Sequence, residues 1–313
     1  MNRLAREWWV LIALGVLLAT LALGAPAFFR PGQLLSLLTA AGPVLLVSSG
    51  VAMVIITRQI DVSIGSNFAW CSVLAGLAAA AGWPMPLVAV VAMGTGALLG
   101  ACNGALVAWL GLPSIVVTLA TLVSWREALR WWREGEYVNQ LPGSFQWFGL
   151  SQGAGQAVLL GVVAVVFATL VWALRWSSGG RFLYAVGSDA DAARLAGLRP
   201  RAVTFGTFAV HGGLIGLAAL LNAIRFADVD PKTGQGLEMQ AIAAAVVGGI
   251  AITGGRGRLW GVLGGVLLLS TIAPALVFFR WPPQWERALQ GGIILLAVAA
   301  EAWRRVDGKT HPV

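Results

Sequence analysis

The chain has 313 residues, of which 58% are hydrophobic and 11% charged, and its formal net charge is +8. Soluble globular chains are about 45–50% apolar and about 25% charged, so this composition excludes an ordinary water-soluble domain and indicates lipid as the solvent. The mean hydropathy of +0.81 agrees. The basic residues are scattered between apolar runs, which favours the topology bias of a membrane protein over nucleic-acid binding.

Ten apolar segments of membrane-relevant length follow one another along the chain. They cover approximately residues 8–29, 34–57, 62–81, 86–110, 114–133, 157–175, 202–223, 239–253, 259–279 and 287–303. Because a helix needs roughly 20 apolar residues to cross a bilayer, the sequence predicts an all-α polytopic transmembrane bundle of about ten spans. We expect one transmembrane domain over residues 1–313, with an uncleaved first helix rather than a signal peptide.

The arginines predict which side of the membrane each connection faces. Counting alternate sides places 13 of the 21 Lys and Arg residues on the side of the N-terminus, and the stretch 176–201 is the densest connector. Connections rich in Lys and Arg stay in the cytoplasm. Both termini and this connector are therefore predicted to be cytoplasmic.

The third segment of each half of the chain is irregular. A division near residue 145 gives five segments in each half, and the halves then enter the membrane from opposite sides, as in an inverted-topology repeat. The run from Asp61 to Gly65 precedes one irregular segment, and Gly248-Gly249 interrupts the other. Paired interrupted segments indicate the lining of a transport pathway.

Polar side chains within or beside the spans are the candidates for that lining. They are Asp61, Ser63, Asn67, Asn103, Thr118, Thr121, Arg126, Asn222 and Gln240. A polyhydroxylated solute needs such hydrogen-bonding groups, but the same residue types also join helices to one another. Arg126 either faces a water-filled path or snorkels to the interface, where Glu127 and Arg130 can pair across three residues.

Two motifs typical of enzymes lack the context that their chemistry needs. The run Gly149–Gly153 matches the nucleophile elbow G-x-S-x-G around Ser151, but no strand precedes it, and the histidines are His211 inside a span and His311 in the tail. A Gly-Lys-Thr run near the chain end lacks the rest of a phosphate-binding loop. The sequence predicts no catalytic residue, no nucleotide site of its own and, from its two isolated cysteines, no metal site.

An ordered set of short motifs resembles the permease subunits of ribose-type ABC importers, a group that also carries xylose, rhamnose or autoinducer-2. Ile60–Gly65 resembles the family's IDLSVG, and Thr118–Thr121 resembles TLGT with alanine for glycine. The remaining matches are Asn103-Gly104 with NG, Gly180–Gly197 with GRxxYAxGxNxxAAxxSGI, and Ala244–Gly255 with AAxxxGG…GG. Arg126 falls where the family often has an arginine, whereas Asp189 and Ala196 depart from the commonest letters.

The resemblance implies a transport subunit of the bacterial inner membrane that imports a monosaccharide or a similar small polar solute. It would dimerise with itself or with a sister permease around a central path. ATP and Mg²⁺ would be bound by separate cytoplasmic ATP-binding subunits. A soluble sugar-binding protein would dock on the outer loops, of which 134–156 and 224–238 are the longest.

The arginine-rich connector contains a short capped helix. Ser188 or Asp189 can cap it, the alanines that follow favour helix, and Gly197 suits its end. The resemblance implies that this is the coupling helix that contacts the ATPase. Its candidate residues are Ser188, Asp189, Ala192, Ala193, Arg194, Leu195 and Gly197.

Two other functions remain open at this point. An ATP-independent secondary transporter of a small polar solute fits the predicted inverted halves and the charges at Arg126 and Glu127. A membrane-embedded hydrolase would use Ser151 as its nucleophile.

Overall fold

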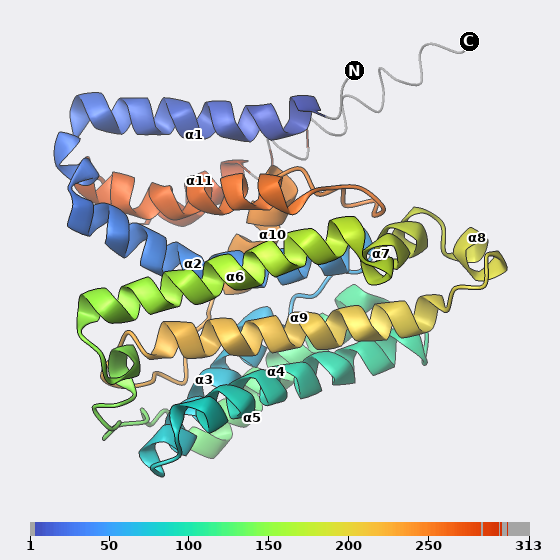
Figure 1. Cartoon of the computed structure of the whole chain (residues 1–313), viewed down its shortest axis with the longest axis horizontal. Coiled ribbons are helices and arrows are strands. Elements are labelled where there is room, and N and C mark those ends of the chain that lie inside the picture. The colour runs from blue at the N-terminus through green and yellow to red at the C-terminus, as the bar shows by residue number, and fades with distance from the viewer. Residues whose placement is uncertain (1–3, 283, 294, 296–298, 300–313) are drawn as a thin grey trace.

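The computed structural model describes residues 4–282, 284–293, 295 and 299, which form a bundle of helices lying side by side (Figure 1). The long helices are α1 (Leu4–Gly24), α2 (Pro31–Ile56), α4 (Met85–Ala108), α5 (Ser114–Arg133), α6 (Gln152–Trp176), α9 (Pro200–Ala223) and α11 (Leu259–Phe278). The shorter ones are η1 (Pro26–Phe29), α3 (Ile64–Ala80), η2 (Gln146–Gly149), α7 (Ser178–Ser188), α8 (Ala190–Leu195) and α10 (Leu237–Val247).

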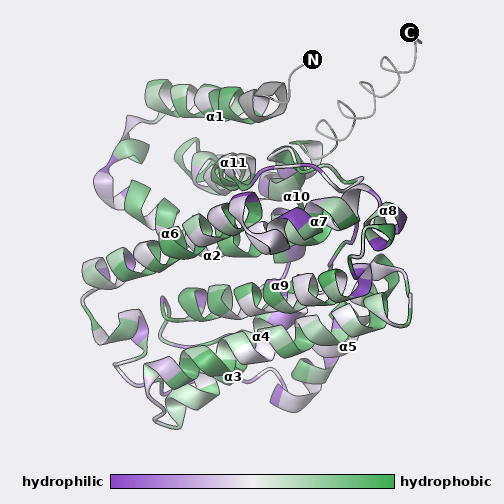
Figure 2. Ribbon diagram, turned by 45° about the vertical axis from the view of Figure 1, so that its right-hand side comes forward, coloured by the Kyte–Doolittle hydropathy of each residue, from purple (hydrophilic) through white to green (hydrophobic). Residues whose placement is uncertain are grey.

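The described helices confirm an all-helical membrane protein. Five of them, α2, α4, α6, α9 and α11, are long and apolar enough to cross a bilayer. Large apolar side chains such as Leu98 (73% exposed) and Val165 (67% exposed) lie on the outside, where lipid would contact them. Hydrophilic residues gather near α7 and α8, at one end of the bundle (Figure 2).

Each of the first nine predicted segments contains a helix of the structure. The tenth, 287–303, lies partly outside the described residues. The count of about ten spans and the inverted repeat therefore stay predictions.

Helices α4 and α9 pack with their backbones in contact. Glycines recur every four residues along α4 and again along α9, and these two rows face each other. A Cβ added at Gly212 would overlap the carbonyl oxygen of Gly96, and one added at Gly100 would overlap that of Phe208. Small residues at this spacing let membrane helices approach closely. This pair is the rigid centre against which α2 and α3 lie.

Among the helices that match predicted spans, α3 and α10 are too short to cross a bilayer. α3 has 17 residues and α10 has 11, so at about 1.5 Å per residue both fall short of the roughly 30 Å hydrocarbon core. Non-helical stretches, 57–63 before α3 and 248–258 after α10, complete these segments. The first turns of α3 and α10 meet, because a Cβ added at Gly65 would contact both the Gly234 carbonyl and the Glu238 carboxylate.

Candidate functional site

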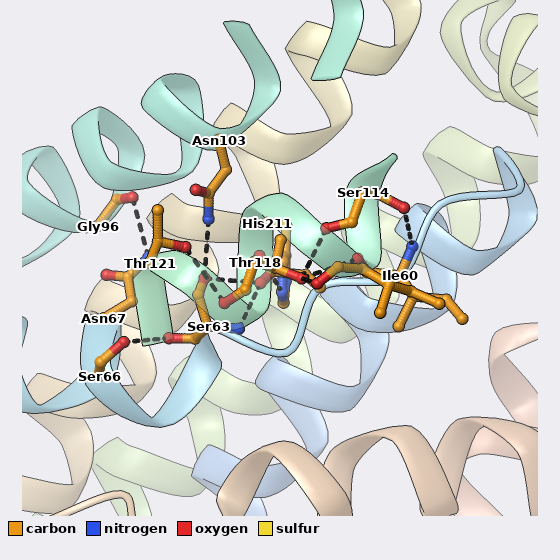
Figure 3. Close-up of polar contacts among 12 residues, drawn as sticks. Ile60, Ser63, Ser66, Asn67, Gly96, Asn103, Ser114, Thr118, Thr121 and His211 are labelled. Carbon is orange, nitrogen blue, oxygen red and sulfur yellow. Dashed lines mark hydrogen bonds and ion pairs between the residues drawn. The ribbon is translucent and has the colours of Figure 1, made fainter. Parts of the chain in front are cut away.

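A buried polar cluster surrounds the start of α3 (Figure 3). The Asp61 Oδ1 atom accepts hydrogen bonds from the backbone N–H of Ser63, at 2.8 Å, and from its hydroxyl, at 2.6 Å. Asn103 on α4 donates from Nδ2 to the Ser63 hydroxyl oxygen at 2.8 Å. All three side chains are at most 1% exposed. The cluster therefore ties the non-helical stretch before α3 to α4.

His211 of α9 faces the same carboxylate. Its Nε2 atom lies 3.7 Å from Asp61 Oδ2, and the two side chains are 0% and 1% exposed. Gly50 on α2 makes room for the ring, since a Cβ there would collide with His211 Nδ1. Residues from α2, α9 and the break before α3 thus meet at one point.

Helix α5 closes the other side of this cluster. The Ile60 N–H donates to the Ser114 hydroxyl at 3.1 Å, and the Thr118 hydroxyl donates to the Ile60 carbonyl at 3.3 Å. One turn into α3, Asn67 donates to the Gly96 carbonyl at 3.4 Å. These side chains join helices, which is the role that sequence reasoning left open for uncharged polar residues.

A second polar group lies where the first turns of α3 and α10 meet. Arg126 of α5 is partly buried and donates to the backbone carbonyls of Thr233, at 3.1 Å, and Pro231, at 3.4 Å. Glu238 accepts the Gly236 N–H with Oε1, at 3.2 Å, while its Oε2 has no hydrogen-bond partner among the described residues. A Cβ at Gly65 would lie 3.1 Å from Arg126 Nη2, so glycine keeps this space open.

The remaining pathway candidates lie outside both groups. Thr121 bonds to carbonyls of its own helix, and the Asn222 side-chain oxygen accepts a bond from Arg225 at 3.3 Å. Gln240 is partly buried on α10. The predicted pair of Glu127 and Arg130 is present, at 3.5 Å and well exposed.

The short helix predicted within 189–197 is present as α8. Asp189 caps it, because its Oδ1 atom accepts the N–H groups of Asp191, at 2.9 Å, and Ala192, at 3.0 Å. These backbone donors, with Arg58 in a smaller part, hold the pKa of the Asp189 carboxyl below its usual value. Gly197 ends the helix with a φ of +84°, a conformation that glycine adopts readily. Leu195 is 88% exposed, whereas Ala193 is buried.

Two contacts hold α7 against the bundle, and a third joins the stretch after α10 to the end of α2. The Arg58 guanidinium donates to the Ser188 carbonyl, and the Tyr184 hydroxyl donates to the Gly257 carbonyl at 2.9 Å. The Gly255 N–H donates to the Ile56 carbonyl at 2.8 Å. The end of α2, the stretch after α10 and the region around α8 therefore form one connected unit.

The two long loops at the opposite end are joined to each other. Val138 and Val229 exchange two backbone hydrogen bonds of 3.0 and 3.1 Å, and the Trp147 N–H donates to the Ile224 carbonyl at 2.9 Å. The nearby Asp230 carboxylate raises the pKa of the exposed Tyr137 hydroxyl. Loops 134–156 and 224–238 thus present a single surface.

The sequence analysis missed the roles of His211 and Glu238, and it correctly rejected Ser151 as a nucleophile for lack of context. His211 and Glu238 were absent from the pathway candidates, although an ionisable residue within a span is itself a signal of function. Ser151, at the centre of the nucleophile-elbow match, caps α6 by accepting the Ala154 N–H at 3.5 Å. This local role accounts for a serine at that position.

Comparison with protein families identifies the class. Residues 33–298 match the family described as the branched-chain amino acid transport system / permease component, and the chain belongs to that family. It is a transport component rather than an enzyme.

Individual relatives within this family confirm the resemblance to the permeases of autoinducer-2 importers. The chain is 36% identical to the autoinducer 2 import system permease protein LsrC of Salmonella typhi, over 94% of this chain and 84% of the relative. It is 37% identical to LsrC of Enterobacter sp. strain 638, over 94% and 85%, and 35% identical to LsrC of Escherichia coli O157:H7, over 90% and 84%. No solved structure matches the chain.

Proposed function

We propose that this chain is the membrane-spanning permease subunit of an ATP-driven importer for a monosaccharide or a related small polar solute such as autoinducer-2. Family membership and the LsrC relatives support this assignment. It acts in the bacterial inner membrane, and α8 with both termini lies on the cytoplasmic side, where the arginine-rich connector belongs. It forms a homodimer or a heterodimer with a second permease.

The observation that carries the proposal is the structure and exposure of α8. This helix is capped by Asp189, follows directly on α7, which Ser188 and Tyr184 hold against the bundle, and presents Leu195 almost fully exposed. An exposed apolar side chain on a rigid helix at the polar end suits a groove on a partner protein. The partner is a cytoplasmic ATP-binding subunit, which holds ATP and Mg²⁺.

The solute passes along the partly exposed polar group around Arg126 and Glu238, facing the second permease. Two half-helices point their N-terminal ends at this group, and those ends carry partial positive charge. Arginine donates hydrogen bonds and glutamate accepts them, so together they can satisfy the hydroxyl groups of a small polyol. The joined loops 134–156 and 224–238 are the docking surface for a soluble solute-binding protein.

Coupling follows from the connections of α8. ATP-driven closure of the ATPase subunits displaces α8, which leads directly into α9 and follows Ser188, the residue that Arg58 ties to the stretch before α3. Motion at the cytoplasmic end thereby changes the position of the α3 N-terminus beside the solute route. The chain moves the solute and carries out no chemistry itself.

Leu195→Arg tests the proposal in proteoliposomes that contain the permease, its ATPase and its solute-binding protein. We expect ATP-driven uptake to fall by about tenfold or more, since a charge replaces an apolar contact at the interface. The control is Thr169→Val on α6, whose exposed hydroxyl donates only to the Val165 carbonyl of its own helix, at 2.8 Å. Uptake that does not depend on ATP but is abolished by an ionophore would overturn the proposal in favour of a secondary transporter.

A further inference from the structure

Asp61 and His211 form an isolated buried pair. Their facing atoms are 3.7 Å apart, and in the part of the chain that the structure describes no Lys or Arg lies within 4.0 Å of the Asp61 carboxylate. Neither nitrogen of His211 has a hydrogen-bond partner there, and Asp61 Oδ2 has none. Unpartnered polar atoms at this depth are costly, so their placement opposite one another needs a reason.

The number of protons that the pair holds explains why these atoms face each other. With a neutral imidazole and an ionised carboxylate the pair carries one negative charge, shut away from water. One added proton gives either imidazolium with carboxylate or imidazole with carboxylic acid, and both are neutral overall. A buried site strongly favours the neutral pair, because a lone charge in a low dielectric loses its hydration without compensation.

The pair also connects two moving parts. Asp61 lies in the break before α3 and positions Ser63, whereas His211 lies midway along α9. Helix α9 follows α8 after the turn at Gly197, and its backbone contact with α4 stiffens it. A shift of α8 therefore reaches the start of α3 through this pair.

We propose that Asp61 and His211 hold one proton between them, and that this neutral pair fastens the start of α3 to α9, which makes His211 a positioning residue for transport. The inference deepens the proposed function and depends on it. His211 touches Asp61 rather than the solute route, so it acts through the placement of α3. Loss of the shared proton leaves one negative charge buried between α3 and α9, which weakens their attachment and the coupling between ATP hydrolysis and uptake.

Other ionisable groups around the pair are few. Helix α2 has none between Pro31 and Ile56. The neighbouring elements contribute Arg58 in the stretch before α3, Cys71 on α3, Cys102 on α4, Arg201 on α9, and Arg126, Glu127, Arg130 and Arg133 on α5. Among these groups, Cys71 donates to the Asn67 side-chain oxygen at 3.2 Å. A change of transport with pH that depends on both Asp61 and His211 would thus report on the pair.

A double-substitution cycle tests the inference in the same proteoliposomes. His211→Leu leaves the carboxylate alone, and we expect about a tenfold fall in uptake per ATP hydrolysed. Adding Asp61→Asn removes the stranded charge, so the double variant should recover at least about half of that loss. Thr207→Val is the matched control on α9, since its hydroxyl bonds only within that helix, at 2.7 Å.

A second readout separates a shared proton from simple packing. The Asp61→Asn/His211→Gln variant replaces the pair with two neutral amides, which no proton can change. Wild-type uptake should fall as alkaline pH removes the proton, while this variant should show no such fall. Additive losses in the cycle, or equal pH profiles, would overturn the inference. Absence of ATP-driven uptake by the wild type would instead refute the proposed function.

Discussion

The two polar groups of this protein lie at the same end of α3 but differ in exposure and in charge. The Asp61 group is almost fully buried, and the bond from Asn103 to Ser63 joins α4 to the start of α3. The Arg126 and Glu238 group is partly exposed and faces the junction of two half-helices. Polar residues within membrane spans thus divide into those that hold helices together and those that remain available to a solute. Substitutions should separate the two roles.

The largest effect on stability should come from the backbone contact that supports the buried group. Gly212→Ala places a methyl group against the Gly96 carbonyl, and overpacking of this kind costs about 1–3 kcal/mol. We expect a clearly lower unfolding midpoint in detergent. At the control position, Gly213→Ala, the new methyl would meet Ala97 Cβ at an ordinary 3.8 Å. Equal midpoints for the two variants would contradict the close packing of α4 and α9.

Removing a bond within the buried group should cost less. Asn103→Leu deletes the donor to the Ser63 hydroxyl, a loss of about 1 kcal/mol in the free energy of unfolding. Thr271→Val is the comparison, because that hydroxyl bonds only to a carbonyl of its own helix. Thermal unfolding measures both. A stable Asn103 variant with defective uptake would move this residue from the helix-joining group to the solute route.

The partly exposed group should show the opposite pattern. Arg126→Gln keeps a donor but removes the charge, so we expect nearly unchanged unfolding and about a tenfold loss of uptake, or about 1.4 kcal/mol. Arg130→Gln is the control, since its pair with Glu127 is 77% and 60% exposed and contributes at most about 1 kcal/mol. Normal uptake by the Arg126 variant would remove this residue from the route.

The smallest effect is expected at Thr121. Its hydroxyl bonds to the carbonyls of Val117 and Thr118 in its own helix, so valine in its place loses little. Uptake by Thr121→Val should stay within about twofold of wild type. A tenfold loss would instead place this side chain in contact with the solute.

Much of the fold could be predicted from local and compositional signals. Apolar segment length predicts the helices, and Asp189 and Gly197 predict the bounds of α8, because capping depends on neighbouring residues alone. The Gly248-Gly249 pair predicted the break that follows α10. The polar candidates for the pathway could not be sorted in the same way. Hydrogen-bonding residue types look alike in a sequence whether they join helices or face a solute.

Sequence by itself determined the solvent of this protein, its helices and the capped α8, since composition, periodicity and caps act over a few residues. Tertiary structure alone decided that His211 meets Asp61, that α3 and α10 join at their first turns, and that Asn103 is fully buried while Arg126 is only partly so. Those outcomes depend on contacts between residues distant along the chain. The close approach of α4 and α9 brings such residues together.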